Sequence, residues 1–518
     1  MLDPADLKFH RRFCINPCYT LRLPRARMDL YTDPLAAGSR GDPYPVTHRA
    51  GEAEEIVSNG RYTVTSQAGG EIARLLCCHH PYHGLSVTLW DLSEASEAGF
   101  CLRSGEHFIR GLLRREGASV RLVWEIDLPD KGFVRQSTDI LRPWQPGMRF
   151  MLLWSVIDVA ALVQTDAAPE LLDRPFIALP GIGRPEVYSA ATDSLLCRAA
   201  ADGQVTASEA EAFFHCGAGQ ADLHVMRYED GTPIFTDGRL YFTLSTRAAG
   251  EHNAVVSWDP SGCDLRMEGC LFFDQGDGEH LPDGPSSVIY DRRSMCWYVW
   301  EASFLRGHVL CRGSARADLR HGVHYIPVRR MELEAGADPM QPALSDDTLF
   351  LGKFGDEDPD LVFDAATGLW NLAICRVVQE GAHERYCYHR FVSRDPLDGF
   401  VFADRTSVGS NTGGSFVRMD GGLSFVCGSD FGTRALYHVF PANDFSAAPR
   451  KLSCDFDDGG FRGWGTVIAL PCGDFERYLF FTFDRVLKGE GNWSYGNLYA
   501  FEADRMRPLP ESFRGELR

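Results

Sequence analysis

The chain has 518 residues, of which 44% are hydrophobic and 12% aromatic, and its formal net charge is -19. This length exceeds what one hydrophobic core usually serves, so we expect two or more domains, and the composition is that of a folded chain. The negative charge argues against a nucleic-acid groove or an anionic membrane surface as the main partner. No apolar run approaches the roughly 20 residues that span a bilayer.

The N-terminal stretch MLDPADLKFHRRFCINPCY has no apolar signal core, which predicts a cytoplasmic protein or one whose signal has been removed. The 16 cysteines show no repeated spacing, so we expect buried thiols rather than a disulfide framework. Residues 1–49 are rich in Pro, Arg and Gly and are expected to form an irregular arm.

Residues 50–165 contain short strand patterns separated by Gly and Pro turns. The patterns are RYTVTSQ, GLSVTLWDL, GFCLRSG, HFIRGLLRREG, SVRLVWEIDL and GMRFMLLWSV. Their close spacing predicts an antiparallel β-sandwich. Residues 166–220 are expected to form a connector with one or two short helices, because TASEAEAFFHCG offers Thr206 or Ser208 as an N-cap and Gly217 as a stop.

The segment CCHHPYHG, from Cys77 to Gly84, raises the question of a metal site. Zinc sites need four ligands that converge. Adjacent residues of an extended strand point to opposite faces, so only half of these side chains can meet. No second Cys/His pair at finger-like spacing follows. We therefore favour a strand that runs into a Pro-Tyr-His-Gly turn over a metal site.

From about residue 222 a two-strand pattern recurs five times. Each copy has a short apolar strand, a turn that usually carries Asp or Gly, and an aromatic-rich strand. The copies are GTPIFTDGRLYFTLST, PSSVIYDRRSMCWYVWEAS, PDLVFDAATGLWNLAICR, GSFVRMDGGLSFVCGSD and GTVIALPCGDFERYLFFTFD. Their spacing leaves room for four strands each. The sequence therefore predicts an all-β fold with an antiparallel β-sandwich followed, in residues 221–518, by a five-bladed β-propeller.

In a propeller the innermost strand of each blade lines a central channel, and the residues just before that strand face the funnel. These residues are Asp230, Asp283, Asp358, the pair Asn411 and Thr412, and Arg462-Gly463-Trp464. Carboxylates that converge from different blades would supply the acid and the base that glycosidic cleavage needs. Turn capping is the alternative use of such aspartates. It explains Asp358, which is flanked by Asp356, Glu357 and Asp360, less well.

The repeated unit resembles the five-bladed propellers of glycoside hydrolase family 43 and its relatives in families 32, 62 and 117. DGTPIFTDGRLYF is similar to the opening of their first blade, and DPDLVFDAATGLW to their Asp-Pro motif. The resemblance covers about residues 230–505. It implies that Asp230 is the catalytic base, with Gly231 where the family usually has Pro, and that Asp358 orients the acid and raises its pKa. The preceding sandwich resembles the lectin-like accessory domains of such propellers.

The resemblance fails at the fourth blade, where the family's general acid is a Glu and this chain has GSNTGGSFVRMDGG. Neither Asn411 nor Thr412 can donate a proton near neutral pH. The acid would then be Glu301, in an aromatic strand where partial desolvation would raise its pKa, or Glu357. An edge-facing surface position is the alternative for Glu301.

The fifth blade carries aromatic and glycine residues in FRGWGTV and GEGNWSYGNLYAFE that are expected to form a sugar platform. Trp464, Trp493 and Tyr495 would stack on a sugar face, and Arg462 would hold a hydroxyl or carboxylate. Packing between blades is the alternative use of the tryptophans. Asn411 and Thr412 are further candidates for substrate binding.

These patterns predict a glycoside hydrolase that acts on an oligosaccharide or glycoside, and the resemblance implies a furanoside such as an arabinofuranoside or a fructoside. Two alternatives stay open. One is a cytosolic glycoside phosphorylase with a phosphate pocket built from Arg462, Arg434 and Arg385. The other is a catalytically silent sugar-binding propeller. No cofactor or catalytic metal is expected, a structural calcium in the channel is left open, and the oligomeric state is not predicted.

Overall fold

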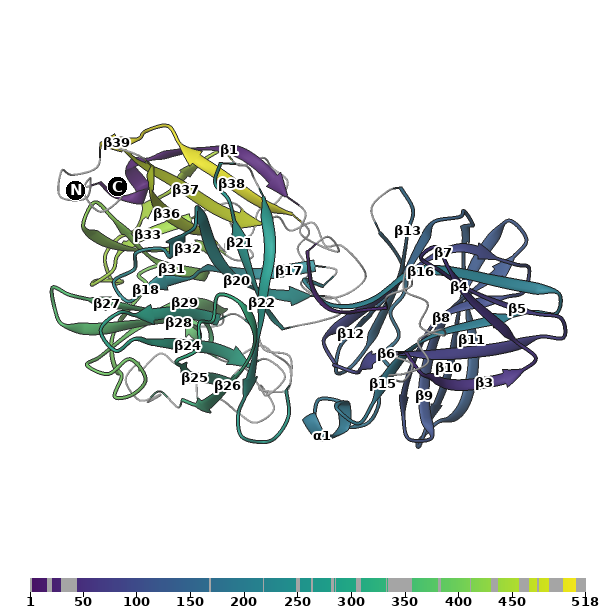
Figure 1. Cartoon of the computed structure of the whole chain (residues 1–518). Helices are drawn as coiled ribbons and strands as arrows, with labels where there is room; N and C mark the ends of the chain where they lie inside the picture. The colour runs from purple at the N-terminus through teal and green to yellow at the C-terminus, as the bar shows by residue number, and fades with distance from the viewer. Residues whose placement is uncertain are drawn as a thin grey trace. The chain divides into compact units, whose positions relative to one another are not determined.

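The computed structural model divides the chain into two compact units (Figure 1). We call Arg22–His215 the two-sheet unit, and Met1–Leu21 together with Cys216–Arg518 the ring unit. The structure describes residues 2–15, 21–28, 44–166, 169–217, 219–247, 252–261, 264–280, 284, 286–303, 309–331, 333, 356–380, 383–409, 411–429, 437–455, 465–472, 475–483 and 497–508.

The described residues are nearly all in strands. They include one α-helix of four residues, α1 (Pro185–Tyr188), and one 3-10 turn, η1 (Pro4–Asp6). None of the helices in these ranges is long and apolar enough to cross a membrane.

The two-sheet unit consists of two antiparallel sheets. The seven-stranded sheet has the order β11 (Gly132–Pro143), β10 (Ser119–Leu128), β9 (His107–Glu116), β8 (Glu97–Ser104), β15 (Thr192–Ala199), β6 (Gly70–Cys78), β3 (Val46–Gly51). The eight-stranded sheet has the order β14 (Glu170–Asp173), β13 (Val159–Gln164), β12 (Met148–Trp154), β7 (His83–Leu92), β16 (Gly203–His215), β5 (Arg61–Ser66), β4 (Glu54–Ser58), with β2 (Arg22–Arg27) also paired to β16.

Both sheets contribute side chains to one buried core. Phe100 from β8 stacks on Phe150 from β12, with ring centroids 6.3 Å apart. Along β5 the buried residues Tyr62 and Val64 alternate with more exposed ones, as expected for a strand with one face on a core. The six strands predicted between residues 61 and 156 are confirmed as β5, β7, β8, β9, β10 and β12.

The helix predicted for residues 206–217 is wrong, because most of this segment belongs to β16. Ala and Glu favour helices, but intrinsic propensity is a weak preference that tertiary packing overrides. Ala207 and Ala212 are buried in the core. The pairing of β16 with β7 shifts register near Glu209, whose φ is 51°.

The segments expected as a connector and as an irregular arm also contain strands. Residues 166–220 supply β14, β15 and β16 to the two-sheet unit and form α1. Within residues 1–49 the chain forms β1 (Lys8–Ile15), β2 and the start of β3.

Most strands of the ring unit fall into five antiparallel groups of four. The groups are β17 (Gly219–Val225), β20 (Arg239–Arg247), β21 (Asn253–Trp258), β22 (Leu265–Asp274); β23 (Ser286–Asp291), β24 (Cys296–Ser303), β25 (Val309–Ala315), β26 (Gly322–Arg330); β27 (Glu357–Asp364), β28 (Leu369–Glu380), β29 (His383–Ser393), β30 (Val401–Arg405); β31 (Asn411–Met419), β32 (Gly422–Ser429), β33 (Tyr437–Pro441), β34 (Arg450–Lys451); and β36 (Thr466–Cys472), β37 (Phe475–Phe483), β38 (Leu498–Ala503), β1. The short strands β18 (Arg227–Tyr228), β19 (Phe235–Thr236), β35 (Ser453–Cys454) and β39 (Arg507–Pro508) pair at their margins.

The first strands of the five groups form a closed ring. β17 neighbours β23, β23 neighbours β27, β27 neighbours β31, β31 neighbours β36, and β36 neighbours β17. Asp358, near the start of β27, is hydrogen-bonded to Thr412 and Gly413, near the start of β31. These two ring strands therefore begin at the same end, which we call the leading end of the ring.

The hairpins predicted from residues 285, 359, 414 and 465 are confirmed as β23–β24, β27–β28, β31–β32 and β36–β37. The first copy was misplaced. Its ring strand is β17, which lies before residue 231, the predicted start of the pattern, and residues 231–238 form β19 and a turn before β20.

The N-terminal strand completes the last group. β1 pairs antiparallel with β38, with Phe9 opposite Ala503 and Ile15 opposite Leu498, and Figure 1 shows the purple β1 alongside the yellow β38. Phe9 is fully buried, and its ring centroid lies 5.8 Å from that of Phe480. Strands from the two ends of the described chain therefore share one core.

A buried ion pair ties the ring strands together. Arg227 in β18 donates hydrogen bonds to Oδ1 of Asp360 in β27 and to the carbonyl oxygen of Phe416 in β31. Asp360 also accepts from Oγ of Ser287 in β23 at 2.8 Å and from the backbone N–H of Phe416 at 2.6 Å. Arg227 is 2% exposed and Asp360 is fully buried. Hydrogen bonds to both carboxylate oxygens offset the cost of burying this charge.

Replacing Phe9 by Ala should lower the free energy of unfolding of the ring unit by about 3–5 kcal/mol, because it removes a fully buried ring. Denaturant unfolding followed by tryptophan fluorescence would measure the loss. Lys8→Ala, at a neighbouring position whose side chain is 54% exposed, should change it by less than about 1 kcal/mol. Equal effects of the two variants would show that β1 does not close this unit.

Asp360→Asn should lower the free energy of unfolding by about 3–5 kcal/mol, since it leaves the buried guanidinium of Arg227 without its counter-charge. Adding Arg227→Met to this variant should recover part of the loss, because no unpaired charge then remains. Asp318→Asn, which breaks an exposed pair with Arg320, should cost less than about 1 kcal/mol. Additive losses in the double variant would argue against coupling between the two charges.

Candidate functional site at the leading end of the ring

Four carboxylates crowd residues 356–360, and two of them are compensated by arginines. Asp356 is held by Arg376 of β28, with Nε 2.6 Å from Oδ1 and Nη2 2.7 Å from Oδ2. Asp360 is paired with Arg227. Asp358 is the fully buried member of this cluster that has no such arginine partner among the described residues.

Asp358 occupies a left-handed bulge of β27. Its φ is 52°, and the pairing of β27 with β28 shifts register between Glu357 and Asp360. The regular strand alternation expected for residues 356–358 is therefore broken at this residue. Oδ2 of Asp358 accepts from Oγ1 of Thr412 at 2.8 Å and from the backbone N–H of Gly413 at 3.0 Å. Oδ1 has no hydrogen-bond partner among the described residues.

The surroundings of Asp358 favour its protonated form. Burial raises its pKa well above the ordinary value, and the negative charges of Glu357 and Asp222 raise it further. The hydrogen bonds from Gly413 and Thr412 lower the pKa but do not outweigh these effects. A carboxyl group with a raised pKa and a free oxygen is suited to proton transfer.

Asp222 in β17 is a second buried aspartate that the sequence candidates did not include. It is 2% exposed and has a φ of 61°, at a register shift between β17 and β20. Asp222 and Asp358 thus occupy the same kind of bulge in two ring strands. ADLHV and EDPDLV each place an aspartate just before apolar strand residues. That similarity could have revealed Asp222 had residues 219–225 been interpreted as a strand.

The structure does not bring Asp230 to Asp358. Oδ1 of Asp230 accepts from the backbone N–H of Thr232 at 2.9 Å, and Oδ2 lies 3.0 Å from Nη2 of Arg292. The adjacent Gly231 faces Val362, which is four residues along β27 from Asp358, on the order of 13 Å. Burial raises the pKa of Asp230, but its hydrogen bonds and the charge of Arg292 lower it overall. The geometry separates two aspartates that we expected in one pocket.

The two acids suggested from sequence, Glu301 and Glu357, both lie near the leading end. Glu301 is fully buried in β24 rather than exposed at an edge, and it is opposite Ser286 at the start of β23. Glu357 is half-buried, adjacent to Asp358 and opposite Cys375. Glu357, Asp358 and Cys375 place one ligand atom each within 4.8 Å of one another, but a thiol is not a calcium-type ligand.

Asn411 and Thr412 are buried and already hydrogen-bonded. Oδ1 of Asn411 lies 2.9 Å from Nδ1 of His438, and its amide nitrogen donates to the carbonyl oxygen of Val408 at 2.5 Å. Thr412 is the sequence candidate that the structure brings to Asp358. The resemblance expects a glutamic acid at the start of this strand, where the chain has Asn411 and Thr412. The candidates Arg462, Trp464, Trp493 and Tyr495 lie outside the described residues, as do Asp283, Arg434 and the side chain of Arg385.

No protein-family model matches the sequence, and no curated protein matches it. Similar solved structures include the catalytic domain of a family 62 α-L-arabinofuranosidase from Coprinopsis cinerea, with 14% identity over 56% of this chain and 92% of that chain and a TM-score of 0.36. A family 43 β-1,3-galactosidase has 12% identity over 54% of this chain and 93% of that chain, with a TM-score of 0.35. A variant of the NanB sialidase from Streptococcus pneumoniae has 8% identity over 90% of this chain and 82% of that chain, with a TM-score of 0.25.

The chain is thus similar in structure to glycoside hydrolases, including members of families 43 and 62 that the sequence resembles. At these identities and TM-scores the similarity assigns neither a catalytic residue nor a substrate to this chain.

The raised pKa of Asp358 predicts a pH-dependent stability difference between the wild type and Asp358→Asn. A carboxyl whose pKa is higher in the folded than in the unfolded state stabilises the protein at pH below the unfolded value of about 3.9. That contribution is lost as pH rises through the folded pKa. Asp358→Asn cannot ionise. Between the unfolded and the folded pKa of Asp358, the free energy of unfolding of the variant minus that of the wild type should therefore increase by up to about 1.4 kcal/mol per pH unit.

Denaturant unfolding at a series of pH values above 4 would measure this difference. Asp364→Asn, at the other end of β27, controls for the general effect of replacing an aspartate in this strand. A stability difference between Asp358→Asn and wild type that stays constant with pH would contradict the raised pKa.

Proposed function

We propose that the chain is a glycoside hydrolase whose ring unit is a five-bladed β-propeller, with the reaction at the leading end of the ring. The observation that carries this proposal is Asp358, a fully buried carboxyl with one fixed oxygen and one oxygen that has no partner in the described part of the chain. Cleavage of a glycosidic bond needs a proton for the leaving oxygen. A carboxyl group whose burial favours the protonated form can supply it.

Asp358 takes the role of the general acid in this proposal, in place of the orienting role that the resemblance implies. Thr412 and Gly413 hold Oδ2, so the proton is directed through Oδ1. Asp222 is the proposed general base toward water, in place of Asp230, because its charge acts on Asp358 and its strand belongs to the ring. Glu357 and Glu301 are two further carboxylates near the leading end, and either could share the second role.

The finer substrate assignment rests on the sequence resemblance alone. It favours a furanoside such as an arabinofuranoside or a fructoside. The two-sheet unit is proposed to be a lectin-like β-sandwich that accompanies the catalytic unit. A structural calcium in the channel and a cytoplasmic location are also proposed from the sequence alone.

A sugar-binding protein without catalytic activity is the second candidate, and Thr412 favours it. The chain has Asn411 and Thr412 where the resemblance expects the acid, and the Thr412 hydroxyl donates to Asp358, so an acid–carboxylate pair of the family's kind is not expected here. The phosphorylase gains no comparable support. Arg227 and Arg376, which flank the acidic cluster, are engaged by Asp360 and Asp356 rather than arranged around a phosphate pocket.

The decisive experiment compares hydrolysis of an alkyl and an aryl arabinofuranoside by the full chain. Asp358→Asn should lower turnover of the alkyl glycoside by about 10²–10⁴-fold, the usual contribution of a general acid. It should spare the aryl glycoside, whose leaving group needs little protonation. Asp222→Asn should slow both substrates, because the attacking water loses its base. Asp230→Asn is the matched control and should stay close to wild type.

Full turnover of the alkyl glycoside by Asp358→Asn would rule out the assigned role. Glycan binding by the wild type without hydrolysis of any glycoside in a wider panel would establish the sugar-binding alternative. Cleavage that depends on inorganic phosphate would establish the phosphorylase.

A further inference from the structure

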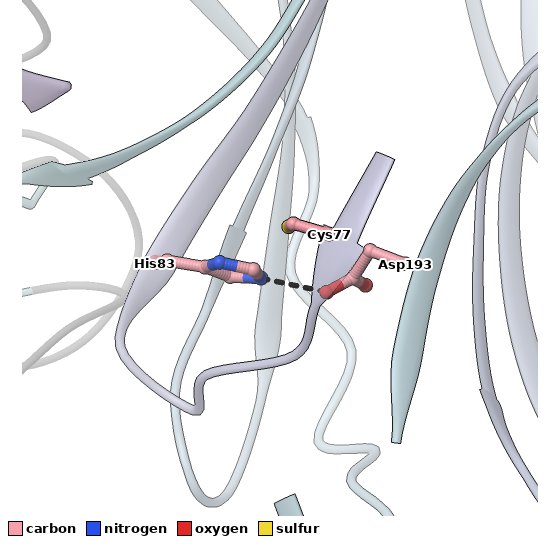
Figure 2. A group of neighbouring side chains, drawn as sticks. All are labelled: Cys77, His83 and Asp193. Atoms are coloured by element: carbon pink, nitrogen blue, oxygen red, sulfur yellow. Dashed lines mark ion pairs between the residues drawn. The ribbon is translucent and has the colours of Figure 1, made fainter. Parts of the chain in front are cut away.

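Three side chains of metal-ligating types meet in the two-sheet unit. One ring nitrogen of His83, the Sγ of Cys77 and a carboxylate oxygen of Asp193 all lie within 4.8 Å of one another, and Figure 2 shows the three side chains pointing toward one another. His83 Nε2 is 2.9 Å from Asp193 Oδ2. His83 and Asp193 are fully buried, and Cys77 is half-buried. A thiol, an imidazole and a carboxylate are all ligands that zinc takes in proteins.

Strand geometry explains which residues of CCHHPYHG take part. Cys77 in β6 is directly opposite Asp193 in β15. His79 follows two positions later, and its Nδ1 lies 2.9 Å from Oδ2 of Asp193. The intervening Cys78 is exposed, and His80 packs against Tyr82, Tyr188 and Phe214 instead. The alternation expected from the sequence therefore holds, and half of the cluster converges while the other half does not.

We propose that Cys77, His83 and Asp193, with a water as the fourth ligand, form a zinc site that links the two sheets of this unit. β6 and β15 belong to the seven-stranded sheet, whereas His83 begins β7 of the eight-stranded sheet. Bonds of about 2.0–2.3 Å to zinc place tetrahedral ligands about 3.3–3.8 Å apart. The present separations, between 2.9 Å and 4.8 Å, would reach these values by small side-chain rotations. A metal bound there would connect the sheets through side chains at the β6–β7 connection.

The carboxylate of Asp193 points to a ligand rather than to a closed hydrogen-bond network. Oδ1 of Asp193, which is fully buried, has no hydrogen-bond partner among the described residues. His83 Nε2 lies 2.9 Å from the other oxygen, Oδ2. His79 is a positioning residue, because its contact with Oδ2 holds the carboxylate while Oδ1 stays available.

Arg25 of β2 is the group with which the metal would compete. Its Nη1 lies 2.8 Å from His83 Nδ1 and 3.8 Å from Cys77 Sγ, and it donates to the carbonyl oxygen of Cys78 at 2.7 Å. An arginine can only donate, so Nδ1 of His83 accepts and the proton of a neutral ring lies on Nε2. Metal binding requires that proton to leave and Arg25 to turn away. Removal of the arginine charge should therefore strengthen binding.

The test uses the full chain without an affinity tag, stripped of metal with a chelator and titrated with Zn²⁺ or Co²⁺. The wild type should bind one equivalent that raises the melting temperature, and Co²⁺ should give a thiolate charge-transfer band. Cys77→Ser should lose the band and that equivalent. Cys78→Ser, which changes the exposed neighbour, is the matched control and should keep both. Arg25→Gln should tighten binding about tenfold, equivalent to about 1.4 kcal/mol.

Asp193→Asn provides a second, nearly isosteric loss variant should Cys77→Ser fail to fold, with circular dichroism as the check. Equal metal content in the wild type, Cys77→Ser and Asp193→Asn would place the metal elsewhere and overturn the proposal. The absence of a bound equivalent from both the wild type and Arg25→Gln would overturn it as well.

Discussion

The ring depends on one buried carboxylate, that of Asp360. Its two oxygens accept hydrogen bonds from Arg227, Ser287 and the backbone of Phe416, which lie on three other strands. The same guanidinium also donates to the carbonyl oxygen of Phe416. Both the N–H and the carbonyl group of this β31 residue are therefore bound by the ion pair. Apolar contacts are not directional, so they could hold these strands at many relative positions along their axes. A carboxylate with directional partners fixes one relative position for each strand. It thereby aligns the leading ends at which Asp358 and Thr412 meet.

The crowding of acidic residues in 355–360 is resolved by giving each carboxylate a different environment. Asp356 is neutralised by an arginine beside it, and Asp360 by an arginine from another part of the ring. Asp358 receives, from the residues that the structure describes, neutral donors on one oxygen, and its burial next to Glu357 and Asp222 makes ionisation costly. Similar residues close together in the sequence therefore acquire distinct chemistry. Two of them stabilise the fold, and the third is the group that the proposed reaction uses.

The strands that sequence reasoning predicted well are those whose side chains alternate around a clear turn. β23–β24 and β27–β28 have apolar, β-branched and aromatic residues on both sides of an aspartate-bearing turn. The segment of β16 was predicted as a helix because Thr206, Ser208 and Gly217 offer helix caps, and its pairing between β5 and β7 shows that it is a strand. β17 lacks such a turn, because β18 and β19 lie between it and its hairpin partner β20.

The site was harder to predict for a related physical reason. The bulges at Asp222 and Asp358 need positive φ values at aspartate, which neither periodicity nor propensity reveals. The link between Asp358 and Thr412 joins residues on different ring strands, and no local pattern encodes it. The carboxylate cluster itself was visible in the sequence. Which carboxylate would lack an arginine partner depended on Arg376 in the next strand and on Arg227, 133 residues from Asp360.

The closure of the last strand group by β1 sets an order on folding during synthesis. Arg12 in β1 and Glu502 in β38, which form an ion pair, are 490 residues apart. At roughly 5–20 residues per second, β1 leaves the ribosome about 25–100 s before its partner strand is made. The two-sheet unit, encoded between them, can fold in that interval, whereas the apolar face of β1 cannot be covered by its native neighbours. An unpaired strand of this kind invites pairing with other chains. Misassembly of the ring unit is therefore most to be expected at β1, which is synthesised first and pairs with β38 last.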